Sequence, residues 1–376
     1  MKPTDLMAPL YPNLLTAPPP PTASVGGSVF RLDSKFRRPR VQELTFAAER
    51  QVFANTVLIA TYIYSKGQHL QQSYDANLPA PTFERRYQSP DGTSFTVPFS
   101  AGVIRTAAGV AQNINLSRPD PVAGATNVSS SQNESQCNTI FLELRRRYAR
   151  GVQLSIGYTL AKAENHSGSG GGNGSSAEGA FGEGTPADQF NLASNRGLNV
   201  SGIWEPRLRN GGSRARLVNG FRFSGIYTAE PGQAISSLVN VPSIPFLGGD
   251  GAVYNGFGGL RGQGNAGDRN LLPTVARNGL VGDNNFRVDL RIARIFSFSE
   301  RLKFEVLAEV INIFNRSNYN SFLTTAYIAA ATTNATPLAS PVTLTPVATF
   351  FCPNGNRFQP DATNARRLQI SARFRF

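Results

Sequence analysis

Few residues in this chain have the types and spacing that chemistry needs. The two histidines, His69 and His166, each lack a metal-ligating residue three or four positions away. A metal site or a histidine-activated nucleophile would need such a partner or a comparable constellation. We therefore predict no catalytic, cofactor-binding or metal-binding residue, no cofactor and no enzyme activity.

The two cysteines, Cys137 and Cys352, are too few for a disulfide framework and lack the spacing of metal ligands. We place both at the outer ends of strands or in loops. A single bridge between them and two unpaired thiols are equally compatible with the sequence.

The acidic pair Glu305 and Glu309 is the remaining candidate for acid–base chemistry. On a strand the two carboxylates would face the same way about 14 Å apart, at ~3.4 Å per residue, which is too far for a glycosidase. We interpret them as part of a polar lumen wall, with Lys303 and Arg287 as expected counter-ions. The predicted lumen-facing polar residues are Arg287, Asp289, Arg291, Lys303, Glu305 and Glu309.

A glycine-rich run, GSGGGNGSS, occupies Gly168–Ser176. A phosphate-binding loop requires a strand before the run, a helix after it and usually a lysine. No helical pattern follows here. We interpret the run as a flexible, exposed linker.

The net charge of +13 and the isoelectric point near 10.2 are values that nucleic-acid-binding proteins share. Most arginines, however, take the polar positions of alternating segments or lie in loops, and only Arg145–Arg147 form a compact run. We therefore favour a solvated lumen with basic loops, which could also meet anionic lipopolysaccharide, and expect no nucleic-acid partner.

A helical membrane protein is excluded by composition. Hydrophobic residues make up 40% of the chain, the mean hydropathy is -0.23, and no apolar run approaches the roughly 20 residues that a spanning helix requires. This test does not detect a membrane β-barrel, because apolar and polar residues alternate along its strands and the hydropathy of each strand averages to near neutral.

The segment Asn285–Asn315 positions the polar residues named above. Apolar and polar residues alternate in two runs separated by a few residues around Ser297–Arg301. This two-residue period predicts a hairpin of strands with one apolar and one polar face. Each arm is about a dozen residues long, which suits a tilted strand that crosses a bilayer in about 9 to 11 residues.

The same pattern recurs along the chain. Further hairpins are predicted over residues 40–65, 138–163 and 194–229, where the last joins Ser194–Glu205 to Leu217–Ala229, and a final strand at 366–376. Long stretches with only brief extended candidates separate them, at 66–136, around 168–176, at 230–284 and at 316–365. Short turns and long loops thus alternate strictly, as in outer-membrane barrels with periplasmic turns and extracellular loops.

The membrane interface is predicted at the lone tryptophan, Trp204, near a turn, and at Tyr227. Arg294 breaks the apolar face of its strand. A lipid-facing arginine costs roughly 2–4 kcal/mol at the midplane and little near the interface, so we expect Arg294 near the membrane edge.

With these segments in place, the chain resembles the C-terminal part of TonB-dependent receptors, in particular the Oar-like group with a carboxypeptidase-regulatory-like domain. The matching pieces extend from about residue 38 to the end and include VLIATYIYSKGQHL, GVQLSIGYTLAKAENHSG, FNLASNRGLNVSGIWE, FRFSGIYTAEPGQAIS, NNFRVDLRIARIF, EVINIFNRSNYNSF and RRLQISARFRF. The resemblance implies an outer-membrane barrel of about 22 strands, plugged by an N-terminal domain and energised by the inner-membrane protein TonB.

The chain departs from that pattern in several respects. Its first residues lack the apolar stretch of a secretory signal. We recognise no plug and no TonB-contact segment, and we count about nine strands. We therefore expect a C-terminal fragment that meets TonB only through a missing N-terminal plug and does not transport alone. The terminal Phe374 and Phe376 resemble the signal read by the barrel-assembly machinery.

The predicted fold class is all-β, a partial transmembrane antiparallel β-barrel of about nine long strands. Residues 1–37 form a disordered or loop arm, and residues 38–376 form the C-terminal portion of the barrel. The predicted function is substrate binding or uptake at the outer membrane of a diderm bacterium, in contact with outer-membrane lipid; the substrate is unknown. The alternatives are a surface adhesion or structural protein and a soluble β-sandwich that binds carbohydrate. The sandwich predicts that Phe221, Phe223, Phe304 and Val306 are buried against a second sheet.

Overall fold

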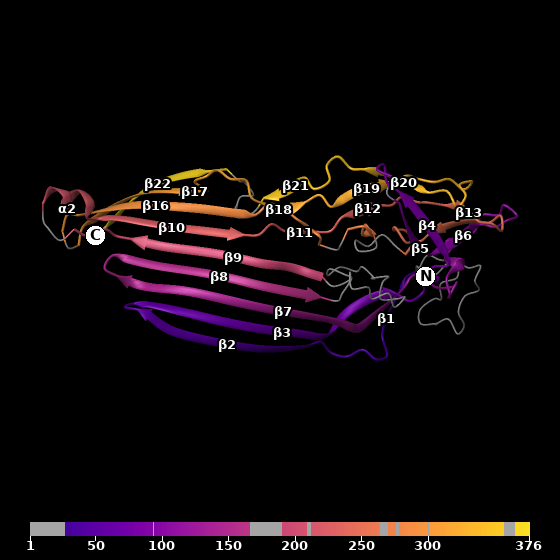
Figure 1. Cartoon of the computed structure of the whole chain (residues 1–376), viewed down its shortest axis with the longest axis horizontal. Coiled ribbons are helices and arrows are strands. Elements are labelled where there is room, and N and C mark those ends of the chain that lie inside the picture. The colour runs from indigo at the N-terminus through magenta and orange to yellow at the C-terminus, as the bar shows by residue number, and fades with distance from the viewer. Residues whose placement is uncertain are drawn as a thin grey trace, which may run out of the picture.

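The computed structural model describes residues 27–92, 94–165, 190–208, 212–263, 270–275, 278–299, 301–356 and 365–376. These residues are almost all in strands or their connections. Long strands lie side by side over one part of the molecule, and short strands gather at one end of them (Figure 1). We call the long strands the wall. The head is the short-strand end, made of the described residues of 76–125, 231–284 and 312–366.

The wall is an antiparallel meander. Among the described residues it has nine long strands, in the order β2-β3-β7-β8-β9-β10-β16-β17-β22. Their bounds are β2 Arg40–Phe53, β3 Thr56–Asp75, β7 Thr126–Ala149, β8 Val152–Asn165, β9 Phe190–Trp204, β10 Phe221–Glu230, β16 Asn285–Ser297, β17 Lys303–Ile311 and β22 Arg367–Arg375. The predicted hairpins and the final strand are thereby confirmed as elements of one sheet.

The pairing register aligns the side chains of each face of the wall from one strand to the next. One row contains, in directly paired positions, Leu58, Leu144, Ile156, Val200, Tyr227 and Val288. The row one residue along, on the opposite face, contains Arg145, Ser155, Ser201, Ile226 and Asp289. Because side chains alternate along every strand, this register gives the wall one apolar and one mostly polar face.

Tight turns lie at the wall end away from the head, where α2 (Ser213–Val218) and the C-terminus also lie (Figure 1). The β7–β8 turn uses Arg150 at φ 53° and Gly151 at φ 80°, a left-handed pair that two-residue hairpins favour. The prediction that a strand begins at Leu217 was wrong. Leu217 lies in α2, and β10 begins at Phe221, just after Gly220.

Two wall strands are longer than predicted. β3 continues to Asp75 and β7 begins at Thr126, inside the stretch 66–136 for which only brief strands were predicted. These extensions are rich in Ser, Gln and Asn, so they show no apolar–polar alternation. Pairing between the two strands, from Gly67↔Ser135 to Asp75↔Asn127, holds them extended instead.

The predicted arm at residues 1–37 is only partly described. Residues 1–26 lie outside the described residues, as do His166 and the run Gly168–Ser176. Residues 27–37 include β1 (Val29–Leu32), which the loop prediction omitted and which pairs parallel with the start of β7.

The head contains the short strands, and the interpretation of these stretches as loops with only brief strands was incomplete. Its elements are β4 Phe83–Gln88, β5 Ser94–Phe99, β6 Ala101–Arg105, η1 Ile114–Ser117, β11 Ala234–Ile235, β12 Leu238–Asn240, β13 Phe246–Leu247, β14 Val253–Gly256, β15 Leu280–Val281, β18 Tyr319–Phe322, β19 Thr325–Ala329, β20 Val342–Pro346 and β21 Pro353–Asn356.

Strands distant in sequence pair to build the head. One sheet runs β12-β19-β20-β4-β5 and combines strands from all three stretches of the head. Another runs β13-β14-β6 and combines strands from 231–284 and 76–125. A buried cluster that includes Tyr87, Phe99, Val239, Phe246 and Leu344 packs between them. These contacts span more than 200 residues, which is why local patterns could not predict them.

The β-sandwich alternative was wrong. Phe221, Phe223 and Phe304 are partly exposed and Val306 is 36% exposed. A sandwich requires these four side chains to be buried, and none of them is.

Candidate functional site

A polar groove lies on the wall face opposite the apolar rows. It has a volume of about 290 Å³ and crosses β8, β9, β10, β16 and β17. Seven of its lining residues are polar, namely Gln153, Ser155, Ser201, Ser224, Asp289, Arg291 and Glu309. The rest of the lining is Gly202, Ile203, Gly225, Ile226 and Leu290. Three of the six predicted lumen residues thus line one groove.

Asp289 is held firmly within this groove. The Arg287 guanidinium donates to both carboxylate oxygens, at 2.7 Å from Nε to Oδ1 and 2.6 Å from Nη2 to Oδ2. The backbone N–H of Asn312 donates to Oδ1 at 2.9 Å. Such a bidentate pair fixes the carboxylate and offsets its charge.

Arg291 and Glu309 lie directly opposite each other on β16 and β17. Neither side chain has a hydrogen bond or ion pair with any residue that the structure describes. Both line the groove, so a guanidinium and a carboxylate are available there to a bound molecule.

The expected counter-ions of Glu305 were wrong. Glu305 is 5% exposed, and its partner is Arg375 of β22, with 3.3 Å between Arg375 Nη2 and Glu305 Oε2. Lys303 lies opposite Ser297 and Arg375 at the turn end of the wall. Lys303 and Glu305 therefore lie on the polar face but outside the groove.

Aromatic side chains form two groups on the apolar face. At the turn end, rings contact one another within β10 and between neighbouring strands, with centroid distances of 5.4 Å for Trp204–Phe223, 5.9 Å for Phe221–Phe223, 6.3 Å for Phe296–Phe304 and 4.5 Å for Phe304–Phe374. The Arg294 guanidinium lies 4.7 Å from the Phe221 ring and 4.9 Å from the Phe296 ring. Arg294 therefore lies in the part of β16 (Asn285–Ser297) that is nearer the turn, and its position at the membrane edge stays a prediction.

The second aromatic group lies at the head end. Tyr227 contacts Phe286 at 6.5 Å, Phe286 contacts Phe314 at 6.4 Å, and the Arg316 guanidinium lies 4.4 Å from the Phe286 ring. The two predicted interface aromatics, Trp204 and Tyr227, thus belong to opposite ends of the wall. Phe376, by contrast, is fully exposed after the end of β22.

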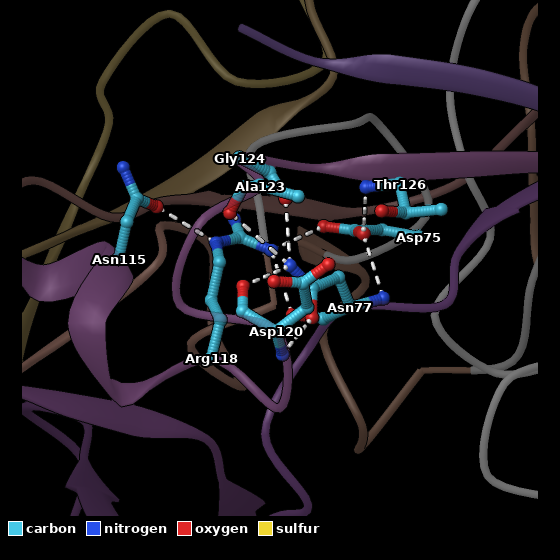
Figure 2. Close-up of polar contacts among 8 residues, drawn as sticks. All are labelled: Asp75, Asn77, Asn115, Arg118, Asp120, Ala123, Gly124 and Thr126. Carbon is cyan, nitrogen blue, oxygen red and sulfur yellow. Dashed lines mark hydrogen bonds and ion pairs between the residues drawn. The ribbon is translucent and has the colours of Figure 1, made fainter. Parts of the chain in front are cut away.

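A buried ion pair joins the head to the wall (Figure 2). Asp75 is the last residue of β3, and its carboxylate accepts from Arg118 Nη1 at 2.8 Å. Both side chains are nearly buried, at 6% and 8% exposure. Asp75 also accepts from the backbone N–H groups of Asn77 and Thr126 at 3.0 Å and 2.8 Å, so it ties both ends of loop 76–125 together.

Asn77 completes this clasp, which we define as Asp75, Asn77 and Arg118. The Asn77 amide donates to the carbonyls of Asp120 and Gly124 at 2.9 Å and 2.8 Å, and its Oδ1 accepts from the Asp120 N–H at 2.8 Å. These bonds can be followed in Figure 2. Sequence reasoning missed the clasp, because an Asx residue after a strand signals a turn but does not identify a partner 41 residues away.

The core of the head contains a fully buried arginine, Arg85. β4 alternates and points Phe83, Arg85 and Tyr87 toward the core. Arg85 is 0% exposed, and its guanidinium has no hydrogen-bond partner among the described residues, with the Phe246 ring 5.4 Å away. Burial lowers the pKa of Arg85 and raises the pKa of Tyr87, whose hydroxyl donates to the Leu260 carbonyl at 2.8 Å.

The two cysteines are not joined by a disulfide in this structure. Cys137 in β7 and Cys352 in the head are both free thiols. His69 lies in β3 with a positive φ of 57°. Among the described residues no group of three or more His, Cys, Asp or Glu side chains could hold a metal ion.

No helix in the described part of the chain is both long and apolar enough to cross a membrane. A search of curated proteins found no match. Among solved structures, the chain is similar to the outer membrane transporter YddB from Escherichia coli, with 10% identity and a TM-score of 0.40. That similarity covers 79% of this chain and only 32% of the transporter chain. A family model described as "Outer membrane beta barrel domain" matches residues 2–341, most of the sequence, and the chain therefore belongs to this family of outer-membrane β-barrel proteins.

Proposed function

We propose that this chain is the C-terminal barrel portion of an Oar-like TonB-dependent receptor, which binds and takes up a substrate without catalysis. The observation that carries the proposal is the polar groove, with available Arg291 and Glu309, on one face of a wall whose other face is apolar. A wall of this kind separates a hydrated lumen from lipid, as transport requires.

The edges of the wall support a role within a larger barrel. No strand pairs with the outer edge of β2 or β22 in the described part of the chain, and the odd count makes these two strands run the same way. Open edges are costly in hydrocarbon. An antiparallel barrel that contains these nine strands needs an odd number of further strands. The first of them must run antiparallel to β22. A second copy in the same membrane orientation would begin with β2 and would not fit.

The two aromatic groups support the membrane placement. Phe286 and Phe296 are ten residues apart on β16, about 34 Å of strand at ~3.4 Å per residue. A tilt of ~40° reduces this to roughly 26 Å, close to the ~25 Å apolar band of outer-membrane barrels. The Trp204 group would then mark the periplasmic interface, the Tyr227 group the extracellular interface, and the head would be extracellular.

Partner proposals follow from the same placement. TonB would act on this chain only through an N-terminal plug, and β22 with Phe374 and Phe376 would engage the barrel-assembly machinery. Phe376→Ser should then lower the amount of protein in the outer membrane. An unchanged amount would remove Phe376 from that role.

The test of transport is genetic. In the native bacterium, we expect deletion of the gene region for this chain and deletion of TonB to abolish growth on the same nutrient source in a panel of single sources. Restoration with Arg291→Ala should leave uptake at least several-fold reduced, whereas the lipid-face neighbour Ile292→Ala should restore it. A growth defect that TonB deletion does not share would contradict TonB dependence.

A surface adhesion protein is the second candidate. It is favoured by the head, whose short strands enclose a buried core of their own. Loss of surface attachment with normal growth on every source would support adhesion over uptake.

A further inference from the structure

Two arginines attach to one short turn at the head end of the wall. The turn consists of residues 312–316, directly after β17, and we call it the basic turn. The Arg316 guanidinium lies 4.4 Å from the ring of Phe286, on the apolar face of the wall. Arg366 comes just before β22, and its Nη1 donates to the Ile313 carbonyl at 3.3 Å. Two separate connections of the chain thus bring positive charge to the same turn.

Hydrogen bonds hold the basic turn in one shape. Asn312 is buried, its Nδ2 donates to the Arg316 carbonyl at 3.0 Å, and its Oδ1 accepts from the Arg316 N–H at 3.2 Å. Asn315 Oδ1 accepts from the backbone N–H of Arg366 at 2.9 Å. Asn312 and Asn315 have φ values of 54° and 52°, a left-handed conformation in which asparagine is enriched. The backbones of Arg316 and Arg366 are therefore fixed relative to each other.

The charge of both arginines is accessible and not neutralised. Arg316 and Arg366 form no ion pair with any residue that the structure describes, and neither does the exposed Asp283 nearby. Arg316 Nη2 donates to the Asn284 carbonyl at 2.9 Å, whereas its Nη1 keeps accessible surface and has no described hydrogen-bond partner. Arg366 is exposed. Guanidinium groups that are accessible in this way suit phosphate, which accepts charge-assisted hydrogen bonds.

Exposed apolar side chains lie beside these charges. Phe314 of the basic turn is exposed, and its ring centroid lies 6.4 Å from that of Phe286. Leu368 and Ile370 follow Arg366 on β22 and are exposed on the apolar face of the wall. The surface therefore changes from cationic at the head to apolar along the wall. A molecule that matches it has anionic groups at one end and hydrocarbon at the other.

We propose that the basic turn binds the lipid A part of lipopolysaccharide, with Arg316 and Arg366 on its phosphate groups and Phe314 and Leu368 against its acyl chains. Lipid A carries phosphate on both sugars of an acylated disaccharide, so it offers separate anionic groups above several hydrocarbon chains. The inference rests on the extracellular placement of the head proposed above, because lipopolysaccharide occupies the outer leaflet. It does not depend on substrate uptake.

Matched lipids test the phosphate contact. We expect the full chain in detergent micelles to bind bis-phosphorylated lipid A at least tenfold more tightly than dephosphorylated lipid A, the worth of one charge-assisted hydrogen bond. Phosphatidylglycerol should bind about tenfold more weakly than lipid A, because it offers a single phosphate. Equal binding of the two forms of lipid A would overturn the proposal. Equal binding of phosphatidylglycerol would show a general surface for anionic lipids and overturn the assignment to lipopolysaccharide.

Matched variants test the location. Arg316→Gln combined with Arg366→Gln should weaken lipid A binding at least tenfold. Arg294→Gln is the control, since it removes an arginine from the same apolar face at the turn end, and binding should be unchanged. Lysine at both positions keeps the charge and should retain most of the binding. Equal losses in the lysine and glutamine variants would show that the arginines only shape the turn, and a loss in Arg294→Gln would place the lipid elsewhere; either result would refute the site.

A thiol label tests the placement of the head separately. Cys352 is an exposed free thiol of the head. In the native bacterium, with Cys137→Ser in place, we expect a membrane-impermeant maleimide to label Cys352 in intact cells as fully as in lysed cells. Labelling only after lysis would put the head in the periplasm and overturn both the orientation and the lipid site. If intact cells are labelled, failure of lipid A to bind overturns the lipid site alone.

Discussion

In the wall, β22 leaves Ile370 69% exposed and Phe374 60% exposed, whereas in the head β4 and β5 bury Tyr87 and Phe99 completely. Both regions use alternating strands. The wall turns its apolar side chains outward to lipid and its polar side chains to the groove, while the head turns apolar side chains inward to a core. The same alternating pattern therefore occurs in two environments. The apolar face meets lipid in the wall and packs against other apolar side chains in the head.

This comparison predicts that the two regions unfold separately. Phe246→Ala should cost the head about 3–5 kcal/mol, because Phe246 is fully buried against Phe83, Phe99 and Tyr254. Hydrogen exchange should show lost protection in β4 and β5 with the wall unchanged. The adjacent, 39% exposed Leu247 is the control, and Leu247→Ala should cost far less. Loss of protection in wall and head together would show one cooperative unit.

A charge on the apolar face of the wall should be nearly as damaging. Leu290 lies in β16 opposite Gly225 and Val310, and Leu290→Arg should cost about 2–4 kcal/mol of unfolding free energy in lipid vesicles. Ser201→Arg on the groove face is the control, and we expect it to cost less than about 1 kcal/mol, since that face meets water. Equal costs for both would mean that the wall faces are assigned incorrectly.

The clasp is where the two regions meet, and weakening it should loosen one of them. Asp75→Asn keeps the shape but removes the charge that Arg118 faces, with an expected cost of about 2 kcal/mol. Hydrogen exchange should report this as faster exchange over residues 76–125. The control is the more exposed pair Arg145–Glu143, where Glu143→Gln should cost at most about 1 kcal/mol. Unchanged exchange in Asp75→Asn would show that core packing alone holds the loop.

The smallest expected effect is a gain. Arg85 occupies an apolar core position of β4 without a described hydrogen-bond partner, so Arg85→Met should stabilise the head by about 1–2 kcal/mol. Thermal unfolding of the head checks this. Arg86→Met changes the exposed neighbour and should be close to neutral. Destabilisation by Arg85→Met would show that the guanidinium makes a favourable contribution in the core.

Sequence reasoning succeeded where the structure repeats a local rule. The faces of β16 and β17 could be read residue by residue, because a strand places Asp289, Arg291 and Glu309 on one side by geometry alone. It also placed Trp204 near a turn, and Trp204 is the last residue of β9. It failed at Leu217, which lies in a short helix and not at the start of a strand. It also failed at the end of β3 and the start of β7, where polar residues obscure the two-residue period.

The sequence by itself determined the all-β class, the alternation of short turns with long connections and the two faces of the wall, because each depends on neighbours one or two residues apart. Only the tertiary structure decided that the long connections fold into a head with a core, that Arg375 rather than Lys303 pairs with Glu305, and that Arg118 meets Asp75. Those contacts join residues tens to hundreds of positions apart. Their partners are selected by packing and burial over the whole chain, which no local period encodes.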